Sequence, residues 1–471
     1  MNKPLKASFT HKVRRPALGM RRAQGRRYQL IRKARRPDPR KIRPGDPDPS
    51  LTRYGGLIDF GRYTRTINVE QTLVHAFGDL KLSPWVVYPM PFVVRTFVDL
   101  YVLGGARPFD IEHAAADAGF RLVVGGLVPS VDVLYDDLRR FDEPHLLIID
   151  QLVADQGIAL TRCRRYKTAN LDIDPTVMPV FGKMEGAAVG YNPQFHGRPA
   201  YHPVVSRLAE SGAILGGLMR VGNTTFGTAE VPFIRLQVQR AKAAFQDDTE
   251  LFVRIDSAGD CEAIMRGIYE EEAHFLIKAR ITEDLQKELQ RPQQWKTMEK
   301  DADGKPEVQL AELKFRRDVW GPAEGEGALP VRVIAVRRND RERRSPSFLW
   351  PEMDWIVDVY LTSDLQGAAY DLVKRYDGRA GIEPLIAEGK IDWHLGACSI
   401  DSFNANAAQL SLKLLTYNLL HRYTERVAPA QRKWRTSWLR RLLIDIPGRF
   451  VRSGRQTVLR LAPRGALIAL E

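Results

Sequence analysis

The chain has little of what exported, zinc-stabilised or membrane-spanning proteins depend on. Its 471 residues include three cysteines, Cys163, Cys261 and Cys398, which lie too far apart to form a paired metal site. We expect them to be buried thiols in a reducing cytoplasm. The sequence also contains no Gly-rich phosphate-binding loop and no serine-hydrolase spacing. A disulfide scaffold, a structural zinc site and P-loop or serine-hydrolase chemistry are therefore excluded.

Long hydrophobic runs are also missing. The most apolar stretch, residues 85–103, is interrupted by Pro89, Pro91, Arg95 and Asp99, so it is not a membrane span. No apolar signal segment opens the chain, and we expect no export. The expected location is the cytoplasm, with no membrane partner.

Positive charge is abundant, and it is distributed unevenly. The net charge is +14, but residues 1–50 carry +13 and residues 432–471 carry +8, which leaves the middle of the chain at −7. Basic ends around an acidic centre suit a protein that binds nucleic acid at its ends and cations in its middle. A solvated tail on an ordinary surface is the alternative. Residues 1–50 are rich in Arg and Pro with few large apolar groups, which predicts a disordered basic arm.

One stretch combines acidic, basic and phenolic side chains at regular spacing. Tyr376, Arg379, Glu383 and Lys390 form the pattern Y-x2-R-x3-E-x6-K. On a helix, at about 100° per residue, the four would share an arc of roughly 60°. A carboxylate flanked by two cations and a phenol suits a metal ligand beside groups that bind phosphates.

Pro384 directly follows Glu383 and disfavours a regular helix through this point, because proline has no N–H to donate and restricts the residue before it. Either the chain kinks here, or a helix begins with Pro384 at its first position and Glu383 as its cap. The second alternative keeps Glu383 and Lys390 aligned on one face. Tyr376 and Arg379 would then precede the helix, and their alignment with that face would be less fixed.

The same spacing resembles that of bacterial insertion-sequence transposases of the DDE, cut-and-paste type. Further blocks that carry the resemblance are Asp174–Thr176, Gly182–Gly186, Gly190–Pro193, Tyr201–Pro203, Arg220–Asn223, Arg254–Ser257, Asn406 and Leu414–Leu420. The likeness covers roughly residues 56 to 460. It implies an enzyme that cleaves DNA at the ends of an insertion sequence and transfers the strands to target DNA by phosphodiester transesterification. A polar residue is more common in this family after the glutamate, so Pro384 is a departure.

Alternating and apolar runs predict the order of a catalytic core. The expected strands are 170–177, 187–191, 213–219, 251–255 and 274–280, with one helix at 232–245 and another between the last two strands. Three strands, a helix, a strand, a helix and a strand is the order of the RNase-H-like fold.

This strand order predicts which carboxylates lie close together. Asp174 ends the first strand and Asp256 follows the fourth, and neighbouring parallel strands would bring them together. Two acids so close repel one another and need a divalent cation, and Glu383 supplies a third ligand. We therefore predict Asp174, Asp256 and Glu383 as catalytic ligands of two Mg²⁺ ions, with Mn²⁺ as a substitute. The residues predicted to bind DNA phosphates are Tyr376, Arg379 and Lys390.

Two other acids compete for the metal site. Asp172 lies two residues before Asp174, and Asp260 lies four residues after Asp256. We favour a strand-edge charge for Asp172 and a helix start for Asp260.

Helical patterns precede this core. Residues 108–112 begin an alanine-rich helix, glycines at 119, 125 and 126 mark a turn, and Ser130 predicts the cap of a second helix that runs to Phe141 and carries Arg139 and Arg140. The pair resembles a helix-turn-helix, and in transposases of this kind the region binds the inverted repeat. A plain helical bundle without DNA contact is the alternative.

Strand-like runs at 308–317, 329–338 and 355–362 resemble the β-rich insertion of hairpin-forming transposases, in which a tryptophan stacks on a flipped base. Trp320 and Trp295 are the candidates, although we favour core packing for both.

The complete prediction is an α/β protein with an RNase-H-like catalytic core and a β-rich insertion, preceded by a helical DNA-binding domain. The expected segments are a disordered basic arm (1–50), the helical DNA-binding domain (51–165), the two parts of the core (166–283 and 365–425), the insertion (284–364) and a basic C-terminal region (426–471). The expected partners are double-stranded DNA, as terminal inverted repeats and target, and a second copy of the chain. The alternatives are a catalytically inactive DNA-binding descendant and a metal-dependent endonuclease without strand transfer.

Overall fold

The computed structural model describes residues 40, 42–192, 195–245, 249–322, 325–339 and 355–463. The predicted basic arm therefore lies almost entirely outside the described residues. Residues 50–471 belong to one compact unit, and the description below concerns this unit. Among its described residues, no helix combines the length and the apolar character that crossing a membrane requires.

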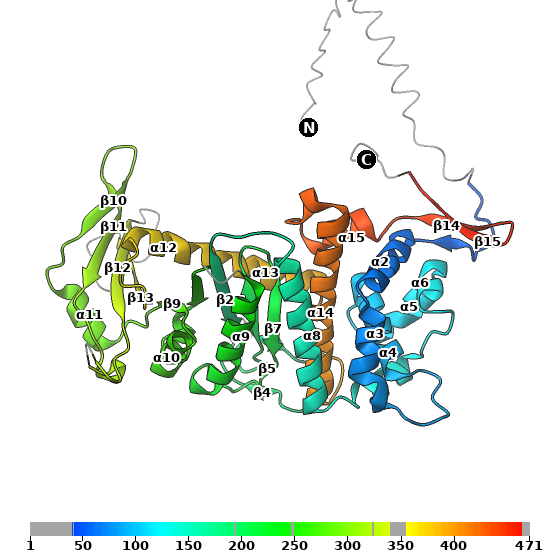
Figure 1. Ribbon diagram of the computed structural model, residues 1–471, viewed down its shortest axis with the longest axis horizontal. Helices are drawn as coiled ribbons and strands as arrows, with labels where there is room; N and C mark the ends of the chain where they lie inside the picture. Colours follow the sequence, from blue (N-terminus) through cyan, green and yellow to red (C-terminus); the bar gives the residue numbers. More distant parts are fainter. Residues whose placement is uncertain are drawn as a thin grey trace, which may run out of the picture. The chain divides into compact units, whose positions relative to one another are not determined.

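A nine-stranded mixed sheet runs through the unit in the order β10-β11-β12-β13-β9-β8-β2-β6-β7 (Figure 1). Its strands are β2 (Ala169–Pro175), β6 (Val204–Leu208), β7 (Ile214–Leu218), β8 (Leu251–Ile255), β9 (His274–Lys278), β10 (Lys296–Lys300), β11 (Pro306–Leu313), β12 (Arg332–Asn339) and β13 (Trp355–Thr362). Strands β2, β8 and β9 are parallel neighbours, and the other pairs are antiparallel. All five residues of β8 are buried, as expected for a parallel strand covered on both faces.

Two helices connect the parallel strands. α9 (Val231–Ala244) leads from β7 to β8, and α10 (Glu262–Glu270) leads from β8 to β9. The order of the five strands β7-β6-β2-β8-β9 therefore reads third, second, first, fourth and fifth along this part of the chain. The expected sequence of three strands, helix, strand, helix and strand is present.

The second of these strands is not where the sequence pattern put it. Residues 187–191 were expected to form it, but β6 occupies that place beside β2. The strand within 187–191 is β4 (Ala188–Val189), which joins β3 (Met178–Pro179) and β5 (Pro199–Tyr201) in a separate three-stranded sheet. Gly190 directly follows β4 and has to be glycine, because a Cβ at this position would lie 2.1 Å from the Gly222 carbonyl oxygen.

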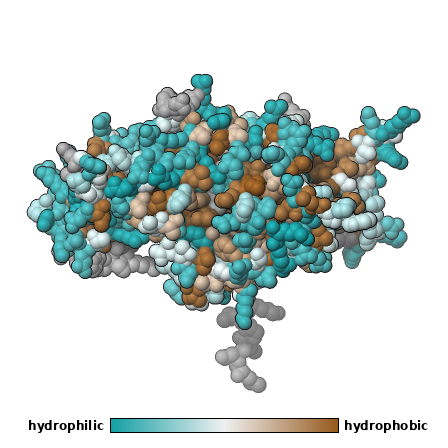
Figure 2. Space-filling view, turned by 60° about the horizontal axis from the view of Figure 1, so that its bottom comes forward, coloured by the Kyte–Doolittle hydropathy of each residue, from teal (hydrophilic) through white to brown (hydrophobic). Residues whose placement is uncertain are grey.

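The predicted insertion extends the same sheet beyond β9. All three expected strands are present as β11, β12 and β13, joined by β10 and by helix α11 (Glu283–Gln290). Trp320 is fully buried, which confirms core packing and removes it as a base-stacking candidate. Trp295 is half-buried, and the Arg337 guanidinium lies 4.3 Å from the centre of its ring. The outward face of this part is mostly hydrophilic, at the left of Figure 2.

Helices precede the sheet in the chain and also follow it. Before the sheet lie α2 (Gly55–Thr66), α3 (Val69–Phe77), α4 (Met90–Val102), α5 (Ile111–Ala115), α6 (Ala118–Val123), α7 (Val131–Leu138) and α8 (Glu143–Thr161), and after it lie α12 (Ala369–Asp377), α13 (Ile382–Asp392), α14 (Phe403–Val427) and α15 (Thr436–Leu443). Ser130 caps α7 as predicted, since its hydroxyl accepts a hydrogen bond from Val133 N at 3.3 Å. The helix ends at Leu138, three residues before the expected Phe141.

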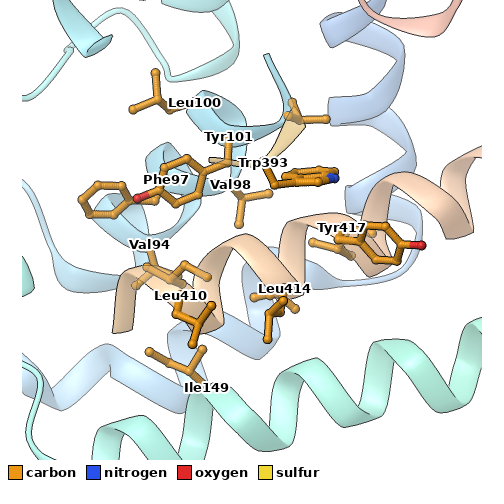
Figure 3. Packing of buried hydrophobic residues seen from close by; sticks show 14 of the residues in the cluster. Val94, Phe97, Val98, Leu100, Tyr101, Ile149, Trp393, Leu410, Leu414 and Tyr417 are labelled. Carbon is orange, nitrogen blue, oxygen red and sulfur yellow. The ribbon is translucent and has the colours of Figure 1, made fainter. Parts of the chain in front are cut away.

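The N-terminal helices share their core with the late helix α14. Nineteen of the 25 residues of α14 are buried, which is typical of a helix surrounded by protein on nearly every side. Figure 3 shows Val94 and Phe97 of α4 in one cluster with Ile149 of α8 and with Leu410 and Leu414 of α14. The helices before residue 166 therefore depend on a segment that follows the whole sheet.

The cysteines differ from the expectation of three buried thiols. Cys261 and Cys398 are partly buried, but Cys163 is exposed. It lies two residues after Thr161, the buried last residue of α8.

Lys413 is a charged residue at the centre of α14, with 1% of its surface exposed. Its Nζ donates a hydrogen bond to the carbonyl oxygen of His394 at 2.6 Å. Burial lowers the pKa of Lys413 to about 7; the nearby Cys398 and Asp110 act against this shift, and Arg107 adds to it. The fold therefore favours the neutral amine.

We expect Lys413→Met to raise the free energy of unfolding at pH 7 by about 1–3 kcal/mol, because it removes a buried ionisable group. The folded-state pKa lies below the unfolded value, so between about pH 7 and 10.5 the unfolded wild type binds more protons than the folded one. Wild-type stability therefore rises across this window, and the advantage of the variant should shrink. Urea unfolding at pH 7 and pH 10 measures both values. A difference that does not change with pH would contradict the assignment.

Candidate active site

Asp174 and Asp256 lie side by side at one end of the sheet. Strands β2 and β8 are parallel, with Asp172 opposite Arg254, and continuing this register by two residues sets Asp174 opposite Asp256. The Asp256 carboxylate accepts a hydrogen bond from Ala258 N at 2.9 Å and caps a short 3₁₀ turn. The sheet and this cap together fix the positions of the two acids.

Glu383 comes from a helix that begins at Ile382, two residues before the start at Pro384 that the second alternative expected. α12 ends at Asp377, a 3₁₀ turn follows at Gly378–Gly381, and α13 starts at Ile382. Pro384 is the third residue of α13, where a helix tolerates a missing N–H because first-turn donors have no acceptor within the helix. The interruption falls at the 3₁₀ turn and not at the proline. Figure 1 shows α12 and α13 running across one end of the strands.

The three acids act on one another electrostatically. Arg379 is 6% exposed and forms an ion pair with Asp174. Burial raises the pKa of Asp174, Arg379 opposes this, and the charges of Asp256 and Glu383 raise it further, to about 6. Asp174 and Asp256 are half-buried, and Glu383 is exposed. The structure thus places Asp256, Glu383 and Arg379 within electrostatic range of Asp174.

Tyr376 and Lys390 occupy different surroundings. Tyr376 is buried, and its hydroxyl donates to the carbonyl oxygen of Ile255 at 3.4 Å, one residue before Asp256. It therefore supports the end of β8, and its phosphate contact stays a prediction. Lys390 is exposed two turns after Glu383. Although the residue as a whole is exposed, the protein around its amine lowers the pKa of Lys390, and the charge of Asp174 acts against that shift, which puts its ammonium group in electrostatic range of Asp174.

The two competing acids are engaged elsewhere. Asp172 is fully buried and binds Arg254 through two hydrogen bonds of 2.6 and 2.9 Å. Asp260 binds Arg317 in the same way, at 2.5 and 3.0 Å. The favoured interpretations were therefore wrong in detail, because Asp172 lies in a central strand and Cys261 caps α10. Both acids are halves of buried ion pairs and are not free to bind a metal.

Two arginines that the sequence analysis assigned no role hold the turn that carries Arg379. Arg254 of β8 donates to the carbonyl oxygen of Arg375, just before the turn. Arg207 of β6 donates to the carbonyl oxygen of Gly381, at its end. A buried arginine in an apolar strand is the only sequence signal for such a role, and it does not say which carbonyl the side chain reaches.

The described residues contain no group of three or more His, Cys, Asp or Glu side chains placed to hold a metal ion. The donor set nevertheless fits a hard divalent cation, which prefers carboxylate oxygens. Asp174, Asp256 and Glu383 share one electrostatic environment, and Arg379 is the cation paired with the first of them. Its Nε is buried without a hydrogen-bond partner among the described residues, so this guanidinium is incompletely satisfied where it lies.

Comparison with known proteins was made on sequence and on structure. A search of the curated proteins gave no significant match. Among solved structures, a cryo-EM structure of a piggyBac transposase synaptic complex with hairpin DNA matches with a TM-score of 0.43 and 12% identity, covering 82% of this chain and 78% of that one. The family model described as transposase DDE domain group 1 matches residues 48–466. The chain therefore belongs to the family of DDE transposases, as its sequence pattern predicted.

Proposed function

We propose that this transposase cleaves DNA at the ends of an insertion sequence and joins the 3′ ends to target DNA, with Asp174, Asp256 and Glu383 as its catalytic acids. The observation that supports this most directly is the meeting of β2, β8 and α13 at one end of the sheet, each contributing one acid. In a DDE transposase this is the position where phosphodiester chemistry is expected. The strand order β7-β6-β2-β8-β9, with α9 and α10 as connections, supports an RNase-H-like core around it.

DDE transposases generally use divalent metal ions. Asp174, Asp256 and Glu383 are the residues that would hold them here, and we take these to be two Mg²⁺ ions, replaceable by Mn²⁺. Bound there, the metal would activate the attacking water or 3′-hydroxyl and stabilise the leaving oxygen. The chain itself orients the DNA: Arg379 and Lys390 are cations beside the acids and would bind phosphates next to the scissile bond. Cleavage and joining are both in-line attacks on phosphorus, so one site serves both.

We propose that the helical region, residues 51–165, recognises the ends of the element. Arg139 and Arg140 lie between α7 and α8 and pair with exposed or neighbouring acids, Asp401 and Asp137. The Arg139–Asp401 pair is exposed on both sides, and such a pair contributes less than about 1 kcal/mol, so a DNA phosphate can replace Asp401 at little cost. The Asp137 carboxylate that binds Arg140 is buried. A second copy of the chain would supply the other end of the element in a homodimer.

A cleavage assay tests the function. The full chain is incubated with Mg²⁺ or Mn²⁺ and a duplex containing the inverted repeats that flank its gene, together with a target plasmid. We expect nicked ends followed by joined products. Cut ends without joined products would identify an endonuclease, and binding without any cut would identify a catalytically inactive descendant.

Arg379→Ala and Lys390→Ala should slow cleavage by about 10- to 100-fold while leaving the products unchanged, because each cation positions a phosphate beside the acids. Arg379→Lys should not restore the rate, since an ammonium lacks the planar fork of a guanidinium. Single-turnover cleavage of a labelled end measures the rates.

Lys374→Ala is the matched control, because Lys374 is an exposed lysine of α12 that pairs with Glu299. Near-wild-type rates for both Arg379→Ala and Lys390→Ala would show that these two cations do not act in cleavage and that the spacing of the motif is a coincidence.

A further inference from the structure

The C-terminal part of the chain forms a narrow β-ribbon. β14 (Gly448–Ser453) and β15 (Gln456–Leu461) are antiparallel and joined by a two-residue turn, Gly454-Arg455. Gly454 has a φ of 61°, which suits glycine in a tight hairpin. A third strand, β1 (Leu51–Thr52), pairs only with the first two residues of β14. The remaining part of the ribbon therefore consists of two strands (Figure 1).

One face of the ribbon anchors it to the protein. Phe450, Leu459 and Leu461 lie on this face, because alternate residues of a strand point to the same side and paired residues share a face. A Cβ added at Gly55, the first residue of α2, would lie 2.4 Å from a methyl carbon of Leu461. This close approach fixes the apolar face against α2 and turns the other face away from it.

The opposite face carries three cross-strand pairs in a row. From base to tip they are Arg449–Arg460, Val451–Val458 and Ser453–Gln456. Like charges directly opposite on a ribbon destabilise it, and the arginine pair is exposed. Arg449 donates to the Ser50 hydroxyl at 3.1 Å, whereas the side chain of Arg460 has no hydrogen bond or ion pair with any other described residue. The face is thus arranged for an anionic partner.

The dimensions of the ribbon indicate duplex DNA as the partner. A two-stranded β-ribbon fits the major groove of DNA, which is about 12 Å wide. Six residues at about 3.3 Å each span roughly 20 Å, or about six base pairs at about 3.4 Å.

The side chains also match what base edges offer. Arginine pairs with guanine, glutamine with adenine, and an apolar group contacts the methyl group of thymine. A row of arginine, valine and glutamine is therefore chemically suited to reading sequence and not merely charge.

We infer that the face formed by Arg449, Val451, Ser453, Gln456, Val458 and Arg460 lies in the DNA major groove and reads base pairs of the element's end. This inference rests on the proposed function, since it takes duplex DNA as the partner. It adds a second sequence-reading element to the helical region, formed by the very end of the described chain.

Selection from a pool of duplexes with a randomised central segment tests the inference. The full-length wild type, Arg460→Gln and Gln456→Ala are compared, with Arg452→Gln as the matched control. Arg452 is also an exposed arginine of the ribbon, but it lies on the anchored face, so its loss removes the same charge without altering the reading face. Thermal unfolding confirms that each variant is folded.

We expect Arg460→Gln and Gln456→Ala to lose base preference at one or two positions and to bind the wild-type sequence about 10- to 100-fold more weakly. Gln456→Ala changes no charge, so its loss of preference cannot be electrostatic. Arg452→Gln should keep the wild-type base preference and change the affinity for every sequence alike, because it removes a charge from the face that does not enter the groove.

Two results would overturn the inference in distinguishable ways. If all three variants keep the wild-type motif, the ribbon contacts phosphates only, and the proposed function stands without it. If the wild type itself selects no motif, the proposed recognition of element ends is wrong. The ribbon inference depends on that recognition and is then wrong as well.

Discussion

Asp174→Asn, Asp256→Asn and Glu383→Gln should each reduce DNA cleavage by on the order of 10³-fold or more, because under the proposed function each removes a charged oxygen ligand from the position where the metal-dependent step would take place. Binding to the element's ends should remain close to that of the wild type, since these acids lie at the sheet and not on the helical region or the ribbon. Cleavage of a labelled end and a gel-shift titration measure the two properties separately. The rise in melting temperature on adding Mg²⁺ should also shrink in each variant.

Asp371→Asn is the matched control for this series. Asp371 is an exposed carboxylate of α12, the helix before the turn that leads to Glu383, and its loss should leave cleavage unchanged. Full cleavage by any of the three variants would remove that residue from the site, and the other two would then need a different third ligand.

Asp172→Ala should lower the free energy of unfolding by about 3–5 kcal/mol. The change leaves Arg254 buried among apolar strands without its carboxylate partner, and the side chain of Arg254 is only 3% exposed. Removing one half of a buried ion pair is costly for this reason, whereas replacing both halves with apolar residues is often neutral or stabilising. Asp172→Leu combined with Arg254→Met should therefore recover most of the lost stability in urea unfolding.

The double variant separates stability from catalysis. Arg254 also donates a hydrogen bond to the carbonyl oxygen of Arg375. Methionine cannot donate this bond, so the turn before Glu383 loses one of the two arginine hydrogen bonds that hold it. We expect the double variant to fold but to cleave more slowly than the wild type. Arg235→Ala, which breaks the surface pairs with Glu270 and Glu271, serves as control and should cost less than about 1 kcal/mol. If Asp172→Ala lowered the free energy of unfolding by no more than Arg235→Ala does, the ion pair between Asp172 and Arg254 would not be buried.

The position of the site could be predicted from the sequence because two of its acids follow apolar strands. A parallel pairing of such strands leaves few places for the residues that come next, and Asp174 and Asp256 indeed lie at the same end of the sheet. The β-rich insertion was visible for a similar reason, since β11, β12 and β13 are long enough to show alternation.

Features that depend on distant backbone could not be predicted. β6 was missed because the small sheet of β3, β4 and β5 lies between it and β2 in the chain, and a sequence pattern does not say which strands pair. The roles of Arg207 and Arg254 depend on carbonyl groups more than 100 residues away. Pro384 was read as a break because the true start of α13, two residues earlier, leaves no side-chain signal: Gly381 makes no side-chain cap.

The shared core of α14 and the N-terminal helices has a consequence for the order in which the protein is made. About 240 residues separate the end of α8 at Thr161 from the start of α14 at Phe403. At a synthesis rate of 5–20 residues per second, the early helices wait roughly 12–50 s for the segment that completes their core. The helical region acquires its final packing only after Glu383 has been translated. A nascent or prematurely terminated chain therefore lacks the finished core of its helical region, and under the proposed function it would bind the DNA ends only after all three acids have been translated.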